Sequence, residues 1–295
     1  MMLALPLMML ALWLLSRGMT ALATDLATEP PDFTEPMTLI APDERDESTI
    51  SVESEVELLA LLAGDDPDPI APGETPRFLY RGKADGESAD LPVLDGVAVA
   101  AVIEAAIGTL AHKSESGTGY LAQLDELDAR DRQDRLCVIG DLYGLDCGLL
   151  VMTCDPRVAL YFAEHEPDGD EAGAGPASIQ RVRLRDFHTH AARSDGQARL
   201  VDVHSVPRTV AERPAAQQAL SLVGVSSEMR DAIRGDGGWH RFRFPQDPNT
   251  SYATPARMVT PKVDPMLDAL AKVAERGKVP GADVEPVIEQ LRRVL

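Results

Sequence analysis

Hydrophobic and polar positions follow two different periods along this chain, and together they predict an α+β fold. Short apolar or alternating runs predict β-strands. These runs are Arg77–Lys83, Leu149–Thr153, Ala177–Phe187, Leu200–Val203, the end of Pro214–Gly224, and Trp239–Phe244. Apolar residues three and four positions apart predict helices. The helical stretches are 52–63, 96–111, one or two helices within 120–142, 156–163, 265–276 and 283–295.

Residues typical of helix ends mark several of these boundaries. Asp155-Pro156 and Asp264-Pro265 each place an N-cap acid before a proline that suits the first helical position. Gly277 is expected to end the helix that starts at Pro265, since glycine favours the C-terminal cap. Ser51 is expected to cap the helix over 52–63.

The central stretch, residues 143–163, predicts a buried strand, a polar corner and then a helix. Thr153 and Asp155 form the corner. Free N–H groups at a helix start suit an anionic ligand, and a threonine hydroxyl can hydrogen-bond one. An ordinary strand-to-helix connection has the same pattern, so both readings stay open.

Arg81 ends the first predicted strand, just before Gly82. A guanidinium there is suited to gripping a phosphate or carboxylate with two parallel hydrogen bonds. An exposed surface charge is the alternative. Gln217 and Gln218 are adjacent on a later predicted strand, where they would point to opposite faces. One of them is then a candidate to line a cleft, and a polar sheet edge is the alternative.

Composition argues against some partners. The formal net charge is −20, which disfavours a nucleic-acid backbone or an anionic membrane surface as the main partner. Aromatic residues make up only 4%, so stacking platforms for single-stranded nucleic acid are not expected. A local basic pocket remains compatible with the sequence, because arginines cluster over 181–185 and 241–243.

No metal site is predicted. His188 and His190 would face one way on a continued strand, but with His204 they give too few ligands for zinc. The cysteines show no C-x-x-C spacing and are expected to be reduced core thiols. They are Cys137, Cys147 and Cys154.

The N-terminal residues 1–16 are almost wholly apolar but short for a membrane span. They resemble a signal-peptide core, with Ala21–Ala23 as a cleavage site. No Lys or Arg precedes the run, and Met19 is an alternative start. We therefore expect a cytoplasmic protein, with export as the alternative. The predicted organisation is a leader over 1–23, a linker over 24–48, an α+β domain over 49–262 and a packed C-terminal helical segment over 263–295.

Four segments, taken in order, resemble the motifs of the FRG-domain family over roughly residues 50–295. The segments are Tyr80-Arg81-Gly82-Lys83, Tyr143-Gly144-Leu145, Thr153 to Ala163 with Pro156 and Val158 to Phe162, and Glu212-Arg213 with Ala216-Gln217-Gln218. The chain departs from the family at three polar positions. Leu142, Gly148 and Val151 stand where the family has His, Arg and Asp.

The family resemblance extends to the layout of ADP-ribosyltransferases. It implies a mixed, mostly antiparallel sheet with flanking helices and an NAD site. In that layout Arg81 would hold the NAD phosphates, and Thr153 would support the nicotinamide-side sugar. The remaining cofactor-site residues implied by the resemblance are Tyr80, Gly82 and Tyr161.

Gln217 or Gln218 would occupy the place of the catalytic acid. An amide carries no negative charge, so it would stabilise a cationic transition state less well. Three hypotheses follow. The chain is an NAD-using transferase or glycohydrolase, a catalytically silent module that binds a nucleotide or a protein partner, or a scaffold.

Overall fold

The computed structural model describes six ranges of the chain: 49–65, 76–84, 93–165, 176–194, 196–245 and 253–295. All of them belong to the compact unit Pro42–Leu295. The predicted leader over 1–23 and the linker over 24–48 lie outside the described residues.

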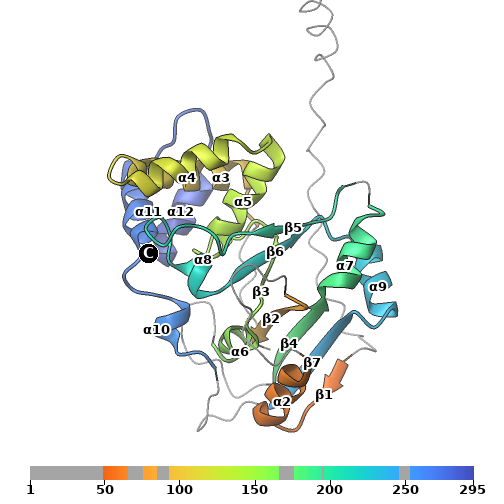
Figure 1. Cartoon of the computed structure of the whole chain (residues 1–295). Helices are drawn as coiled ribbons and strands as arrows, with labels where there is room; N and C mark the ends of the chain where they lie inside the picture. Colours follow the sequence, from red (N-terminus) through yellow and green to blue (C-terminus); the bar gives the residue numbers. More distant parts are fainter. Residues whose placement is uncertain (1–48, 66–75, 85–92, 166–175, 195, 246–252) are drawn as a thin grey trace, which may run out of the picture. The chain divides into compact units, whose positions relative to one another are not determined.

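Seven strands form one mixed sheet in the order β1-β7-β4-β2-β3-β6-β5 (Figure 1). The strands are β1 (Thr49–Ser51), β2 (Phe78–Ala84), β3 (Leu150–Thr153), β4 (Pro176–Arg183), β5 (Arg199–Asp202), β6 (Ala219–Val223) and β7 (Trp239–Pro245). In the described part of the chain, β1 runs parallel to β7 and the other pairings are antiparallel. The predicted α+β class, with a mostly antiparallel sheet, is therefore confirmed.

The pairing between β2 and β3 is the shortest among the described strands. These two strands share one register pair, Tyr80 with Thr153, whereas β2 pairs with β4 along its whole length from Phe78 to Ala84. The sheet thus has two parts, β1-β7-β4-β2 and β3-β6-β5, joined at Tyr80 and Thr153.

Helices cover both faces of the sheet. Their bounds are α2 (Glu55–Asp65), α3 (Gly96–Ala111), α4 (Glu115–Asp125), α5 (Ala129–Asp141), α6 (Pro156–Glu164), α7 (Leu184–Ala191), α8 (Arg213–Ala216), α9 (Ser227–Gly235), α10 (Ala256–Val259), α11 (Pro265–Arg276) and α12 (Glu285–Val294). We call the two faces of the sheet the α6 face and the α7 face, after the helices that pack on them.

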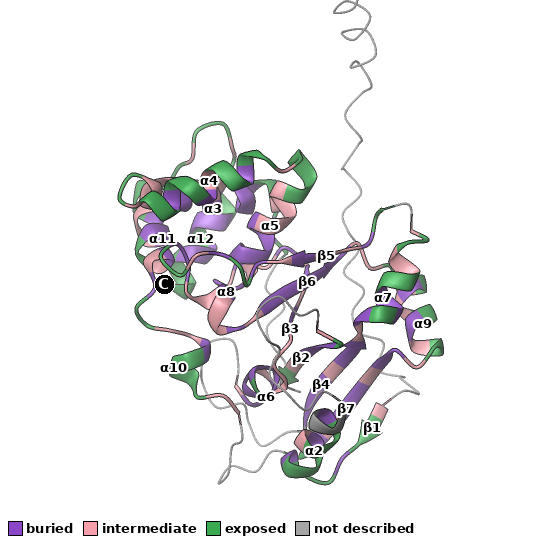
Figure 2. Cartoon of the chain, viewed as in Figure 1, coloured by how far each residue is buried: buried purple, intermediate pink, exposed green. Residues whose placement is uncertain are grey.

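Hydrophobic clusters show what each face buries. On the α6 face, Tyr80 of β2 and Phe242 of β7 pack with Leu160 of α6 and with α2. Beside them, α3, α5, α11 and α12 form the largest cluster with residues of β5 and β6. On the α7 face, Leu79 and Trp239 pack with helices α7 and α9. Figure 2 shows the inner strands β4, β6 and β7 as mainly buried.

Several predicted boundaries are confirmed. Asp155 caps α6 by accepting a hydrogen bond from the N–H of Arg157, and Pro156 opens the helix. Asp264 caps α11 through the N–H of Met266. Gly277 ends α11 with a φ of 68°, a left-handed conformation that glycine adopts without strain.

The predicted strand over 177–187 is wrong in its second half. Strand β4 ends at Arg183, and the chain turns directly into α7. Leu184 and Phe187 are three residues apart and both buried, a spacing that fits a helix as well as an irregular strand. His188 and His190 therefore lie on a helix rather than on a strand.

Helix α4 begins at Glu115, and Ser114 caps it by accepting a hydrogen bond from the N–H of Gly117. Two further expectations need correction. Ser51 lies on β1 rather than capping a helix, and α2 begins at Glu55. Gln217 and Gln218 precede β6 rather than lying on it.

Gly82 allows β2 to lie against the backbone of α6. A Cβ atom at this position would lie 2.6 Å from the backbone nitrogen of Ala163 and closer still to the carbonyl oxygen of Ala159. No side chain fits there without moving the helix. The contact fixes which residues of β2 face α6.

We predict that Gly82→Ala lowers the free energy of unfolding by about 1–3 kcal/mol or more, because overpacking forces the helix from the strand. Gly108→Ala is the matched control, since a Cβ at this position of α3 meets nothing within 4 Å. It should raise stability by up to about 1 kcal/mol. Urea unfolding of both variants measures the difference. Equal stabilities would show that the close strand–helix contact is not a constraint.

Candidate functional site

The sheet brings the predicted site segments onto adjacent strands. Tyr80 of β2 pairs with Thr153 of β3, and Thr153 pairs with Ala219 of β6. Gln217 and Gln218 come directly before Ala219. Segments far apart in the sequence therefore lie on neighbouring, paired strands. Whether they form one site depends on the face of the sheet to which each side chain points.

The Thr153 side chain forms a hydrogen bond within the corner between β3 and α6. Only 4% of the residue is exposed, and its hydroxyl oxygen accepts a hydrogen bond from the N–H of Asp155 at 3.0 Å. Asp155 in turn caps α6. The predicted polar corner is present, and its hydrogen bonds stabilise the start of the helix.

The two glutamines have different surroundings, and both amides are engaged. Gln217 is buried, and its side-chain nitrogen donates to the carbonyl oxygen of Val259 at 3.1 Å. Gln218 is half-buried and has a φ of 46°, which is uncommon for a residue with a side chain. Its side-chain oxygen accepts a hydrogen bond from the thiol of Cys154 at 2.9 Å.

Tyr80 and Tyr161 are packing residues in this structure. Tyr80 is fully buried under α6. Tyr161 is buried among residues of α6 and α10, and its ring stacks on His165 with centroids 4.4 Å apart. Neither ring is exposed to a ligand.

Arg81 points away from Tyr80 and Thr153. Adjacent residues of a strand face opposite sides of a sheet. Because Tyr80 and Gly82 face α6, Arg81 lies on the α7 face, where it is exposed. Thr153 lies on the same face as Tyr80. The Gln218 amide bonds Cys154, which packs on the α7 face. The structure therefore separates Thr153 from Arg81 but not Gln218 from the face of Arg81.

Arg81 belongs to a polar region of the α7 face that the sequence did not reveal. The strand registers place six polar residues from β2, β4 and β7 side by side there. We call this region the polar face, and its residues are Arg81, Lys83, Ser178, Gln180, Arg241 and Arg243. The two-residue alternation in each strand was visible in the sequence, but the pairing of β2 with β4 and of β4 with β7 was not.

The carboxyl group of Asp141 interacts electrostatically with both Arg81 and Asp146. Burial and the negative charge of Asp146 raise the pKa of Asp141 to about 7, and the positive charge of Arg81 opposes that rise. Asp146 also accepts a hydrogen bond from the N–H of Gly148 at 2.6 Å. At neutral pH the Asp141 carboxyl is therefore only partly ionised.

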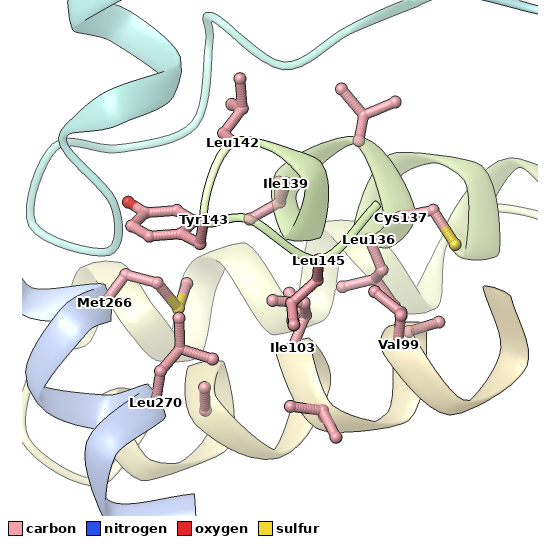
Figure 3. Close-up of a cluster of buried hydrophobic side chains, with 14 of the residues drawn as sticks. Val99, Ile103, Leu136, Cys137, Ile139, Leu142, Tyr143, Leu145, Met266 and Leu270 are labelled. Carbon is pink, nitrogen blue, oxygen red and sulfur yellow. The ribbon is translucent and has the colours of Figure 1, made fainter. Parts of the chain in front are cut away.

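Other motif residues join separate parts of the fold. The hydroxyl of Tyr143 donates to the Asp264 carboxylate at 2.6 Å, and Arg213 lies over the Tyr143 ring at 4.8 Å. Figure 3 shows the Tyr143 ring beside Met266 at the edge of the largest cluster. Burial and the Asp264 charge raise the pKa of Tyr143. This network links the end of α5 to α8 and α11.

The three positions that depart from the family pattern also serve the fold. Leu142 is buried in the largest cluster, and its carbonyl oxygen accepts a hydrogen bond from Arg213 at 2.8 Å. Val151 packs against the same cluster. Gly148 has a φ of 72° in the loop before β3. The apolar or small residues at these positions leave no polar group there to contact a ligand.

The cysteines are free thiols: Cys137 and Cys147 are buried, whereas Cys154 is half-buried. A hydrogen bond with Cys137, together with burial, raises the pKa of Cys147. Among the residues that the structure describes, no group of three or more His, Cys, Asp or Glu side chains is arranged to hold a metal ion. Within the same ranges, no helix combines the length and apolar character needed to cross a bilayer.

Comparisons with protein-family models, with curated proteins and with solved structures found no match to this chain. The α+β fold and the geometry above therefore stand on the sequence and the structure alone.

We predict that Tyr143→Phe lowers the free energy of unfolding by about 1.5–3 kcal/mol, because it removes the shortest of the hydrogen bonds that the buried Asp264 carboxylate accepts. Tyr161→Phe is the control, since its hydroxyl has no hydrogen bond among the described residues, and it should change stability by less than about 0.5 kcal/mol. Denaturant unfolding distinguishes the two. A similar loss in both variants would contradict a structural role for the Tyr143–Asp264 bond.

The raised pKa of Asp141 predicts a pH-dependent stability. The folded state holds this proton up to about pH 7, whereas an unfolded aspartate loses it near pH 4. Between these values the folded state binds more protons, so the Asp141 contribution falls as the pH rises. Asp141→Asn should therefore gain stability over the wild type, on the order of 3 kcal/mol, as the pH rises from 4 to 8. Exposed Glu275→Gln is the control and should show no such trend. A constant difference for Asp141→Asn would contradict the prediction.

Proposed function

We propose that this chain is a catalytically silent, FRG-like module that binds a nucleotide of the NAD type through Arg81. The observation that carries the proposal is the exposed guanidinium of Arg81, which the close contact of Gly82 with α6 turns toward the polar face. A guanidinium in this position is suited to two-point binding of a phosphate group.

The surroundings of Arg81 support an anionic ligand. Arg81 and Lys83 are both exposed. The carboxyl that interacts with Arg81 is that of Asp141, whose pKa burial and Asp146 raise to about 7. The protein as a whole carries a net charge of −20, and a positively charged region on such a surface is a local exception. Fixed positive charges attract phosphate groups and orient them.

The side chains expected to perform catalysis support a silent module rather than an enzyme. An ADP-ribosyl transfer would need a group that stabilises positive charge on the ribose as the bond to nicotinamide breaks. Gln217 is buried, and its amide donates a hydrogen bond to the carbonyl oxygen of Val259. The Gln218 amide oxygen accepts a hydrogen bond from the Cys154 thiol. Thr153 also lies on the face of the sheet opposite Arg81.

An NAD-using transferase or glycohydrolase is the second candidate. It is favoured by the alignment of Tyr80, Thr153 and Ala219 across three adjacent strands, which resembles the ADP-ribosyltransferase layout. In that case the corner at Thr153 would have to open toward the ligand. Release of nicotinamide from NAD over time distinguishes this candidate from the silent module.

We predict that NAD binds the wild-type protein and that Arg81→Ala costs on the order of 1.5–3 kcal/mol of binding free energy. Isothermal titration calorimetry with NAD measures the affinity, and chromatography of the same mixtures detects free nicotinamide, of which we expect none above the uncatalysed rate. Arg185→Ala is the matched control, because this side chain is 83% exposed and lies outside the polar face.

Absence of NAD binding, or equal affinities of Arg81→Ala and the wild type, would contradict the proposed function. Nicotinamide release that is lost in Thr153→Ala would instead support the enzyme.

A further inference from the structure

The thiols of Cys137 and Cys147 lie together in the interior, although they come from different elements. Cys137 belongs to α5, and Cys147 lies in the connection between α5 and β3. Both are buried in the largest hydrophobic cluster, with exposed fractions of 4% and 6%. A hydrogen bond between the two thiols is the largest of the effects that raise the pKa of Cys147. The two sulfur atoms are therefore in direct contact.

The segment that leads into α3 anchors both cysteines. The Cys137 thiol donates a hydrogen bond to the carbonyl oxygen of Gly96 at 3.2 Å, and a Cβ atom on Gly96 would lie 3.3 Å from the Cys137 sulfur. Asp146, which directly precedes Cys147, accepts a hydrogen bond through its carbonyl oxygen from the N–H of Leu94 at 2.8 Å. Because both cysteines are tied to the same short segment, their contact is built into the fold.

Cys154 has different surroundings. It is half-buried, its thiol donates to the side chain of Gln218, and it packs against the cluster on the α7 face. Cys137 and Cys147 belong instead to the largest cluster. The chain thus contains one matched pair of thiols and one separate thiol, and the separate thiol provides an internal control.

We infer that Cys137 and Cys147 form a disulfide when the chain folds in the presence of a small-molecule disulfide such as oxidised glutathione. One cysteine thiolate attacks the glutathione disulfide, forms a mixed disulfide and releases one glutathione thiolate. The second cysteine thiolate attacks the protein sulfur of the mixed disulfide and releases the other glutathione thiolate. Two cysteines are oxidised, one glutathione disulfide is reduced to two thiols, and the two cysteine protons end on those thiols.

The exchange takes place on the folding chain rather than on the folded protein. In the folded protein both thiols are buried and the pKa of Cys147 is raised, so its reactive thiolate form is scarce. The unfolded chain exposes both thiols to the oxidant. The redox conditions during folding therefore determine whether the bond forms.

The disulfide would close a short ring that links the end of α5 to the start of β3. This ring contains Asp141, which interacts with Arg81, and Tyr143, whose hydroxyl donates to Asp264. A cross-link restricts the unfolded chain and so stabilises the folded state. The pair thus makes the stability of this connection depend on redox conditions, whether or not a nucleotide binds the protein.

Oxidative refolding of the full chain tests this inference. The urea-unfolded protein is refolded in parallel with oxidised and with reduced glutathione, and the glutathione is then removed. Peptide mapping without a reductant should find Cys137 linked to Cys147 in the oxidised sample. The urea midpoint of the oxidised sample should be higher than that of the reduced sample.

Two variants complete the experiment. Cys154→Ser should keep both the disulfide and the difference in urea midpoint, whereas Cys137→Ser should lose both. Each variant is compared only with itself under the two conditions, so a change in packing caused by the substitution cancels. If Cys137→Ser does not fold, the peptide map of the wild-type protein still decides the result.

Three results would overturn the inference. They are alkylation of both Cys137 and Cys147 by iodoacetamide after oxidative refolding, a bond that involves Cys154, and equal urea midpoints of the oxidised and reduced samples. Because the experiment contains no nucleotide, these results leave the proposed function untouched, and failure of NAD to bind leaves this inference untouched.

Discussion

The contact between Gly82 and the backbone of α6 is the constraint on which the candidate site depends. It brings β2 so close to the helix that only a residue without a side chain fits between them. Once Gly82 faces α6, the two-residue period of the strand turns Tyr80 into the core and Arg81 and Lys83 to the opposite face. The orientation of every charge on β2 follows from this one packing contact.

The same constraint separates residues that form continuous motifs in the sequence. Tyr80-Arg81-Gly82 is a single motif, but its members divide between a buried core and a polar surface. Tyr143 and Arg213 likewise meet Asp264 in a network that connects α5, α8 and α11. Most motif residues thus maintain the fold, whereas Arg81 and Lys83 are motif residues whose charged groups are exposed.

Local patterns in the sequence were enough to predict the elements of the fold whose ends carry strong signals. Asp155-Pro156, Asp264-Pro265 and Gly277 gave correct helix boundaries because capping depends on a few neighbouring residues. The transition from β4 to α7 was missed, since Leu184 and Phe187 satisfy more than one period. The polar face was missed for a different reason. It depends on which strands pair and in what register, and residues 81, 180 and 241 are brought together only by long-range contacts.

The most direct test of the account is to map which backbone amide NMR signals of the protein shift on addition of NAD. The account predicts shifts concentrated at residues 81–83, 178–180 and 241–243, with little change at the corner formed by Thr153 and Asp155 or along α6. Shifts concentrated instead at that corner and at Gln217 would contradict it, because the ligand would then lie on the face of the sheet that Arg81 does not reach.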